Sequence, residues 1–404
     1  MKHAGSIDTL RPLTLLLLMA SVATVALGYG IALPIFPELM DHGMDAAAKS
    51  WHLGMLTTAY MLALTLSAPV WGGLSDRTSR RAIIFIGLSL SIVGIIVLLL
   101  ALRPWVLYTS QVIFGIATAA VIPVSLAYVA ETTSPGTRSR RFAWMGAAAT
   151  TGVLGGPALG GWLAGPSMDV FGISIQNAAE RPLVAAGFLT VLTLSAAVIG
   201  LSKAGKPVPC VTNRPWTTQI KIRSVAPWLL LAALAAYGLG SLELAATLRG
   251  QQSLQLGPPQ LADLFVTCGV VMLVVQGIFG SGGMWPLDPR RLATPAFVVM
   301  AIGLALAPVA SGPRTLMFFI GAAAAGYGVL VIGLADGISR NAAGQQGGAL
   351  GQQMSAAALG QAIGSAVTGL LSGSSISAAS WVGAGVLLIG ATLAAVPRLL
   401  GRNA

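Results

Sequence analysis

The chain has 404 residues, of which 55% are hydrophobic and only 9% are charged. A soluble globular domain carries about 25% charged residues, so this composition excludes a soluble protein with a core of this size. The net charge of +11 would suggest a nucleic-acid partner in a soluble chain. In membrane proteins, however, basic residues gather in cytoplasmic loops, so their positions have to be considered first.

Apolar segments long enough to cross a bilayer as helices recur along the whole chain. The first apolar run continues to Leu39, which is too long for a cleaved signal peptide and predicts an uncleaved span. Several connections are very short and imply antiparallel neighbours. Twelve spans are expected, over residues 13–39, 51–72, 81–101, 104–130, 141–165, 181–202, 225–248, 258–280, 292–311, 313–337, 349–372 and 377–398.

A polar stretch near the middle of the chain, residues 203–224, is rich in proline and basic residues. We interpret it as a cytoplasmic linker between two six-helix bundles, residues 1–202 and 225–404. A weak repeat supports two related halves, because "AETTSPGTRSRR" follows the fourth span and "ADGISRNAAGQQ" follows the tenth. The expected fold is an all-α integral membrane protein with twelve helices in two pseudo-symmetric bundles, a common plan for transporters.

The distribution of basic residues predicts the orientation. With the N-terminus in the cytoplasm, most of the 23 lysines and arginines fall in inner loops. The exceptions at the outer edge are Lys49, Arg103, Arg181, Arg249 and Arg314. Both termini are therefore expected in the cytoplasm, in a multi-pass protein of a bacterial inner membrane. The positive charge is then a feature of the inner face and does not indicate a nucleic-acid partner.

Three motifs fall in the matching spans. They are "GGLSDRTSRRAI" at residues 72–83, "LGYGIALPIFP" at 27–37 and "GVLGGPALGG" at 152–161. Together they resemble the loop between helices 2 and 3 of the major facilitator superfamily and the helix-1 and helix-5 patterns of its drug:proton antiporters. Ser79 departs from the loop pattern, where the family has a glycine. The resemblance implies the major facilitator fold and export rather than uptake.

The first motif contains an acid next to several arginines at the cytoplasmic end of a span. The resemblance supports a conformational latch, in which Asp76 pairs with Arg80 and faces a helix N-terminus across the interface of the halves, where its charge is favoured. A network of Asp76, Arg80 and Glu131 is expected to hold the inner side closed while the outer side opens. The expected latch residues are Asp76, Arg77, Arg80, Arg81, Glu131 and Arg138. The alternative is that Asp76 only caps a helix and that the neighbouring arginines are ordinary positive charges of a cytoplasmic loop. A degraded second copy is expected at Asp288, Arg290 and Arg291.

Acids within or near the spans are candidates for proton coupling, because a charge within the bilayer is costly and is usually functional or paired. The candidates are Glu243 in the seventh span, Asp263 and Glu38. A carboxyl group that loses contact with water can take up a proton near neutral pH. Glu243 is preferred, since helices 1, 4, 7 and 10 line the cavity of the resembled family. The alternative is a salt bridge between Glu243 and Arg249 or Arg103.

The fourth span departs from the family pattern. Gln111 stands where the antiporters have an intramembrane arginine, which puts simple antiport in doubt or moves that task to another residue. Polar residues in the four cavity-lining spans could contact substrate or another helix. These cavity candidates are Tyr29, Gln111, Tyr237 and Tyr327.

The helix-5 motif combines Gly152, Gly156, Pro157, Gly160 and Gly161. Glycines at every fourth position form a bare stripe that another helix can approach closely, and the proline bends the helix beside it. We expect helix 8 of the other half to pack there, through the outer part of the interface. The alternative is small-residue packing within one half. Gly360 and Gly364 are the expected counterparts in the second half.

The predicted function is proton-coupled efflux of an amphiphilic or modestly polar organic compound, such as a drug or a secreted metabolite, by alternating access. The spans contain few charged residues, which argues against a small sugar or a phosphate as the substrate. The chain has no phosphate-binding loop and no His/Cys metal-ligand spacing, so we expect no enzyme, cofactor or metal. The expected partners are the small-molecule substrate, protons and the lipid bilayer, with the chain acting as a monomer. The alternatives are a nutrient importer and a non-transporting sensor.

Overall fold

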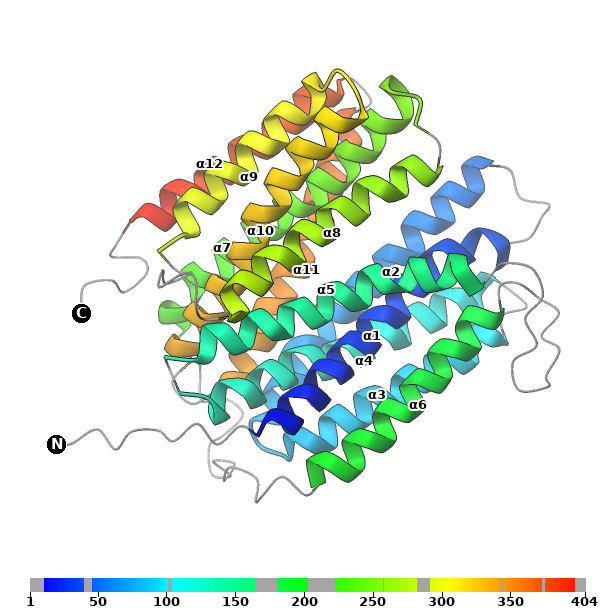
Figure 1. The fold of residues 1–404 in the computed structure, drawn as a ribbon, viewed down its shortest axis with the longest axis vertical. Coiled ribbons are helices and arrows are strands. Elements are labelled where there is room, and N and C mark those ends of the chain that lie inside the picture. The colour runs from blue at the N-terminus through cyan, green and yellow to red at the C-terminus, as the bar shows by residue number, and fades with distance from the viewer. Residues whose placement is uncertain are drawn as a thin grey trace. The chain divides into compact units, whose positions relative to one another are not determined.

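The structure, a computed structural model, describes residues 11–39, 46–100, 104–134, 136–163, 180–202, 222–256, 258–281, 291–342, 345–372 and 375–396. Within these ranges all regular structure is helical, and twelve α-helices follow one another along the chain (Figure 1). They are α1 (Pro12–Leu39), α2 (Ala46–Ser75), α3 (Arg80–Leu99), α4 (Pro104–Thr132), α5 (Arg138–Leu163), α6 (Glu180–Ser202), α7 (Ile222–Leu248), α8 (Pro258–Ser281), α9 (Ala293–Leu306), α10 (Pro313–Asn341), α11 (Gln346–Ser372) and α12 (Ile376–Ala395).

The twelve α-helices coincide with the twelve predicted segments to within a few residues at most ends. Among the described residues, eight of the helices are long and apolar enough to cross a membrane by length and composition. The ninth span was predicted to continue to residue 311, but α9 ends at Leu306 and a 3-10 turn, η2 (Ala307–Val309), follows. Pro308 lies in this turn, and it lacks the backbone N–H that an α-helical hydrogen bond would use at this position.

The chain divides into two compact units. Unit 1 comprises residues 1–133 and 148–214, and unit 2 comprises residues 134–147 and 215–404. The predicted bundles placed all of α5 in the first half, whereas its first residues, up to Ala147, cluster with unit 2. The predicted linker 203–224 lies mostly outside the described residues.

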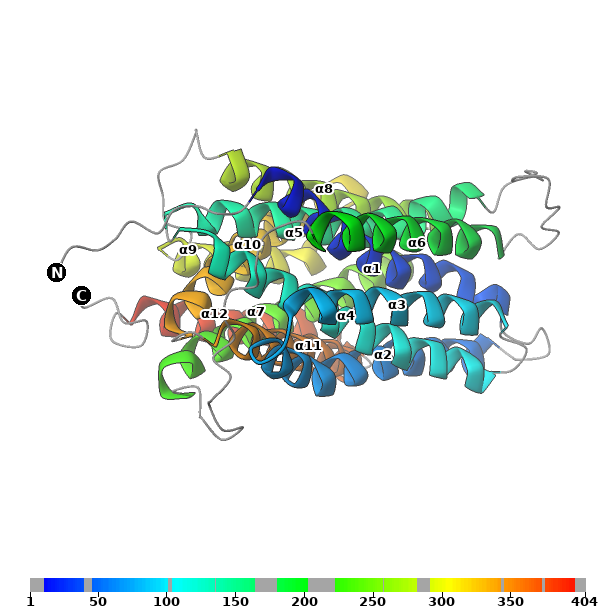
Figure 2. The same cartoon turned by 90° about the horizontal axis from the view of Figure 1, so that it is seen from below.

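The helix pairs of the two units follow one scheme. In unit 1, α4 packs on α1, α2 and α3, while α6 packs on α1 and α3 (Figures 1 and 2). In unit 2, α10 packs on α7, α8 and α9, while α12 packs on α7 and α9. Each of these pairs in unit 1 has a counterpart six helices further along the chain, so the weak sequence repeat reflects a repeated packing arrangement.

Glycines of α5 and α11 have equivalent partners in the two units. A Cβ atom at Gly152 would overlap the carbonyl oxygen of Ala23 on α1. On α11, a Cβ at Gly360 or Gly364 would overlap a carbonyl oxygen of α7. The prediction that the stripe packs on α8 is therefore wrong for Gly152, and the alternative of packing within one half holds there.

The remainder of the helix-5 motif is only partly described. Gly156 is buried, while the side chain of Pro157 and the environments of Gly160 and Gly161 lie outside what the structure describes. The described contact of α5 with α8 lies at the beginning of α5, within unit 2. There a Cβ at Gly280 would press against the ring of Trp144, and the Nε of Arg140 donates to the carbonyl oxygen of Gly280 over 2.6 Å.

Candidate functional site

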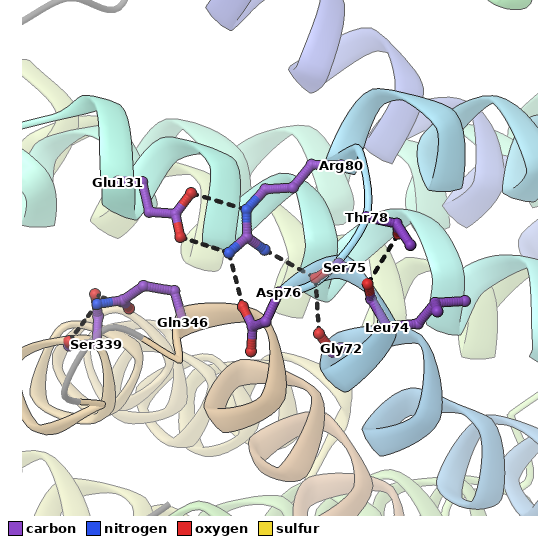
Figure 3. A network of polar contacts seen from close by, with 9 residues as sticks. All are labelled: Gly72, Leu74, Ser75, Asp76, Thr78, Arg80, Glu131, Ser339 and Gln346. Atoms are coloured by element: carbon purple, nitrogen blue, oxygen red, sulfur yellow. Dashed lines mark hydrogen bonds and ion pairs between the residues drawn. The ribbon is translucent and has the colours of Figure 1, made fainter. Parts of the chain in front are cut away.

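A buried guanidinium group organises the end of unit 1 at which α2, α3 and α4 meet (Figure 3). The Nε of Arg80 donates to Oε2 of Glu131 over 2.9 Å, and its Nη2 donates to Oε1 of the same carboxylate. Nη2 also donates to Oδ1 of Asp76 over 2.7 Å, and Nη1 donates to the hydroxyl of Ser75 over 2.8 Å. Arg80 is only 9% exposed, so two acids offset one buried charge.

The local sequence explains why these groups converge. Helix α2 ends at Ser75, whose hydroxyl donates to the carbonyl oxygen of Gly72 over 2.7 Å. A short turn then leads to Arg80, the first residue of α3. A cation at a helix N-terminus opposes the helix dipole, so Arg80 needs anionic partners. Glu131, in the last turn of α4, provides a two-oxygen partner that matches the planar guanidinium.

The predicted latch residues are only partly brought together. Asp76, Arg80 and Glu131 form one network, and Ser75 is a member that sequence reasoning missed. Arg77 and Arg81 lie beside it and are half-buried. Arg138 belongs to unit 2, where it lies within electrostatic range of Asp336 and Arg340.

Unit 2 has its own buried acid at the end of α10. Asp336 is fully buried, and its Oδ2 accepts a hydrogen bond of 2.8 Å from Nε of Arg340. One turn from it, the hydroxyl of Ser339 donates to Oε1 of Gln346 over 2.8 Å, and Nε2 of Gln346 donates to the carbonyl oxygen of Ser339 (Figure 3).

Sequence reasoning did not name Asp336 as a site residue, although it holds the repeat position of Glu131. The expected second copy was placed instead at Asp288 and Arg290, which lie outside the described residues, and at Arg291, which is exposed. The aligned Ala-acid pairs at the ends of the fourth and tenth spans were the signal that could have identified Asp336.

Glu243 lies inside unit 2 on α7. Its Oε2 accepts a hydrogen bond of 3.1 Å from Nε2 of Gln361 on α11. Cys268 on α8 and Tyr327 on α10 lie within electrostatic range of the carboxyl group. All four side chains are partly buried. Three helices, α8, α10 and α11, therefore place polar but uncharged side chains near the carboxyl group that α7 carries.

The predicted alternative, an ion pair of Glu243 with Arg249, is not the arrangement in the structure. Nη2 of Arg249 donates instead to the carbonyl oxygen of Ala310 over 3.0 Å. Arg103, the other suggested partner, lies outside the described residues. Of the remaining acid candidates, Asp263 is exposed, and the side chain of Glu38 is not among those described.

The cavity candidates differ in their surroundings. Tyr327 lies close to Glu243, and Tyr237 is buried where α7 packs on α11. Gln111 is fully buried, and among the described residues its amide has no hydrogen-bond partner. The side chain of Tyr29 lies outside the described residues. Across the described residues, no group of histidine, cysteine and acidic side chains could hold a metal ion.

Twelve α-helices in two units with the same packing scheme, eight of them long and apolar enough to cross a membrane among the described residues, define an all-α membrane transporter. The family model of the Major Facilitator Superfamily matches residues 18–285, and this chain belongs to that superfamily. Its homologues and fold are those of transporters, which are not enzymes.

Relatives include drug-resistance proteins. Tetracycline resistance protein, class G, of Vibrio anguillarum is 33% identical over 45% of each chain, so this match spans less than half of that relative. Multidrug resistance protein 2 of Bacillus subtilis is 23% identical over 82% of each chain, and quinolone resistance protein NorA of Staphylococcus aureus is 23% identical over 81% of each. These relatives support membership of the drug:proton antiporter-like group.

Solved structures with the same fold cover nearly the whole chain. The human organic anion transporter MFSD10 aligns with a TM-score of 0.78 at 18% identity, covering 95% of this chain and all of that one. The Escherichia coli fucose:proton symporter FucP aligns with a TM-score of 0.73 at 14% identity, covering 96% and 98%. At these identities the likeness shows the fold alone.

Proposed function

We propose that this transporter exports an amphiphilic or modestly polar organic compound in exchange for protons, by alternating access of the two units. The names of the relatives support efflux of drugs, and the mostly apolar helices fit such a substrate better than a sugar or a phosphate ester. Both termini lie in the cytoplasm in this proposal, because most basic residues then face inward. The chain acts as a monomer in the bacterial inner membrane.

The environment of Glu243 carries this proposal. Its carboxyl group lies within an apolar helix bundle, and its hydrogen-bond partner is the neutral amide of Gln361 rather than an arginine. An unneutralised charge inside a bilayer is costly, so a carboxyl group without a basic partner favours uptake of a proton. The partly exposed side chains around it would allow protons and substrate to reach the same region. Glu243 is the proposed proton carrier.

The Arg80 network is the proposed cytoplasmic latch. It fixes the turn between α2 and α3 to the end of α4, so Asp76 is presented from a rigid position. In the proposal, Asp76 faces a helix N-terminus of unit 2 when the inner side is closed, where the helix dipole favours its charge. Opening would then require Asp76 to leave that helix end while Arg80 and Glu131 stay paired.

Transport in proteoliposomes tests the proposal. Tetracycline and a quinolone serve as probes, and an imposed pH gradient supplies the driving force. Antiport predicts probe accumulation in vesicles with an acidic lumen, and Glu243→Gln should abolish the dependence of this flux on the gradient. Asp263→Asn is the matched control, because its carboxyl group is exposed. Probe movement together with protons would support an importer, and no flux of any probe would support a sensor.

A further inference from the structure

We infer that Gln361 is a positioning residue that holds the carboxyl group of Glu243 and thereby sets the pH range in which transport is coupled to protons. This inference rests on the proposed role of Glu243 as proton carrier. The sequence pointed to no residue of α11 in this role, and the contact becomes visible only in the packed unit.

The hydrogen bond has a direction that matters for protonation. Nε2 of Gln361 can only donate, and Oε2 of Glu243 accepts from it over 3.1 Å. A hydrogen bond from an amide to a charged carboxylate is stronger than one to a neutral carboxylic acid. The amide therefore stabilises the carboxylate more than the acid, and the uptake of a proton has to compete with this contact.

The two side chains stand on helices that cannot easily separate. A Cβ at Gly240 would overlap the carbonyl oxygen of Gln361, and one at Gly364 would overlap the carbonyl oxygen of Tyr237. The hydroxyl of Ser241 also donates to the carbonyl oxygen of Gly364 over 3.2 Å. Because Gly240 lies three residues before Glu243, on the same side of α7, this close backbone packing keeps the amide of Gln361 within reach of the carboxyl group.

The hydrogen bond from Gln361 is the main polar contact of the Glu243 carboxyl group. Among the described residues, Cys268 on α8 and Tyr327 on α10 are titratable groups that lie within its electrostatic range. Asp263 on α8 is exposed, and Arg249, just beyond α7, is bound to the carbonyl oxygen of Ala310. The described parts of α9, α11 and α12 contain no charged residue.

The test compares Gln361→Met with Gln352→Met in proteoliposomes. Methionine keeps the size of glutamine without its donor. Gln352 lies nine residues earlier on α11, about half a turn around the helix axis from Gln361, so it serves as the matched control. Tetracycline exchange is recorded over a range of pH, and thermal unfolding in detergent verifies that each variant is folded. Gln361→Glu, which keeps the polarity of the site, serves as a second variant.

We expect the pH midpoint of exchange in Gln361→Met to move to higher pH by about one unit, while the maximal rate stays close to that of the wild type. Gln361→Glu should move the midpoint in the same direction, because two neighbouring carboxyl groups cannot both ionise easily. Gln352→Met should leave it unchanged. In a Glu243→Gln background, Gln361→Met should have no further effect on the pH profile, since it acts through that carboxyl group.

A wild-type midpoint in both Gln361 variants, with pH dependence lost in Glu243→Gln, would overturn this inference and leave the proton carrier in place. A slower rate without a shifted midpoint would likewise assign Gln361 to helix packing alone. Retained pH dependence in Glu243→Gln would overturn the proposed carrier and the inference together.

Discussion

Replacing Glu131 by glutamine tests whether the Arg80 network is organised as its geometry indicates. Glu131 accepts two hydrogen bonds from the guanidinium of Arg80, whereas Asp76 accepts one. Glutamine keeps one acceptor oxygen but turns an amide donor toward a group that also only donates. The variant therefore loses one charge-assisted hydrogen bond and the charge that neutralises Arg80. A hydrogen bond to a charged group contributes about 1.5–3 kcal/mol.

The expected loss of stability in Glu131→Gln follows from the burial of Arg80 and Glu131. Arg80 is 9% exposed and Glu131 is 23% exposed, so water compensates only a small part of the lost interaction. We expect Glu131→Gln to lower the free energy of unfolding by about 2 kcal/mol. Asp76→Asn should cost about 1 kcal/mol or less, because asparagine still offers an acceptor to Arg80.

Thermal unfolding in detergent, followed together with tetracycline transport, measures both effects. If Asp76 acts as the latch, Asp76→Asn should impair transport more than it lowers the unfolding temperature, while Glu131→Gln should lower both. A larger loss of stability in Asp76→Asn than in Glu131→Gln would refute the assignment of Glu131 as the main partner of Arg80. Unchanged transport in Asp76→Asn would refute the latch. Asp263→Asn, an exposed acid outside the network, is the control.

Two further predictions concern unit 2. Asp336→Asn should lower the free energy of unfolding by about 2 kcal/mol, because the buried partner of Arg340 loses its charge. Arg291→Gln, at an exposed position, is the control. Equal unfolding temperatures of the two variants would contradict this prediction. Gly364→Ala should lower the free energy of unfolding by about 2 kcal/mol, since its Cβ would overlap a carbonyl oxygen of α7. Gly385 has open space around it, so Gly385→Ala should be neutral or slightly stabilising. Equal unfolding temperatures for the two alanine variants would show that α7 and α11 are not in close contact.

The partners of individual polar groups were harder to predict than the helices. The repeat indicated that Gly152 and Gly360 have related roles, yet the sequence did not reveal that each packs on the first helix of its own half. The stripe has no polar group that would select a partner, so only the arrangement of the helices decides which backbone approaches it. The same holds for Gln361, whose position in an apolar span carries no local sign of Glu243, 118 residues away in sequence.

By itself, the sequence determined the twelve helices, the family and the residues of the Arg80 turn, because hydropathy, helix length and short motifs are local properties. The tertiary structure decided which of these residues meet. It added Ser75 to the predicted network around Arg80, assigned Arg138 to the surroundings of Asp336, and gave Glu243 an amide rather than an arginine as its partner. Such contacts depend on the rotation and depth of each helix in its unit, and periodicity alone does not fix these.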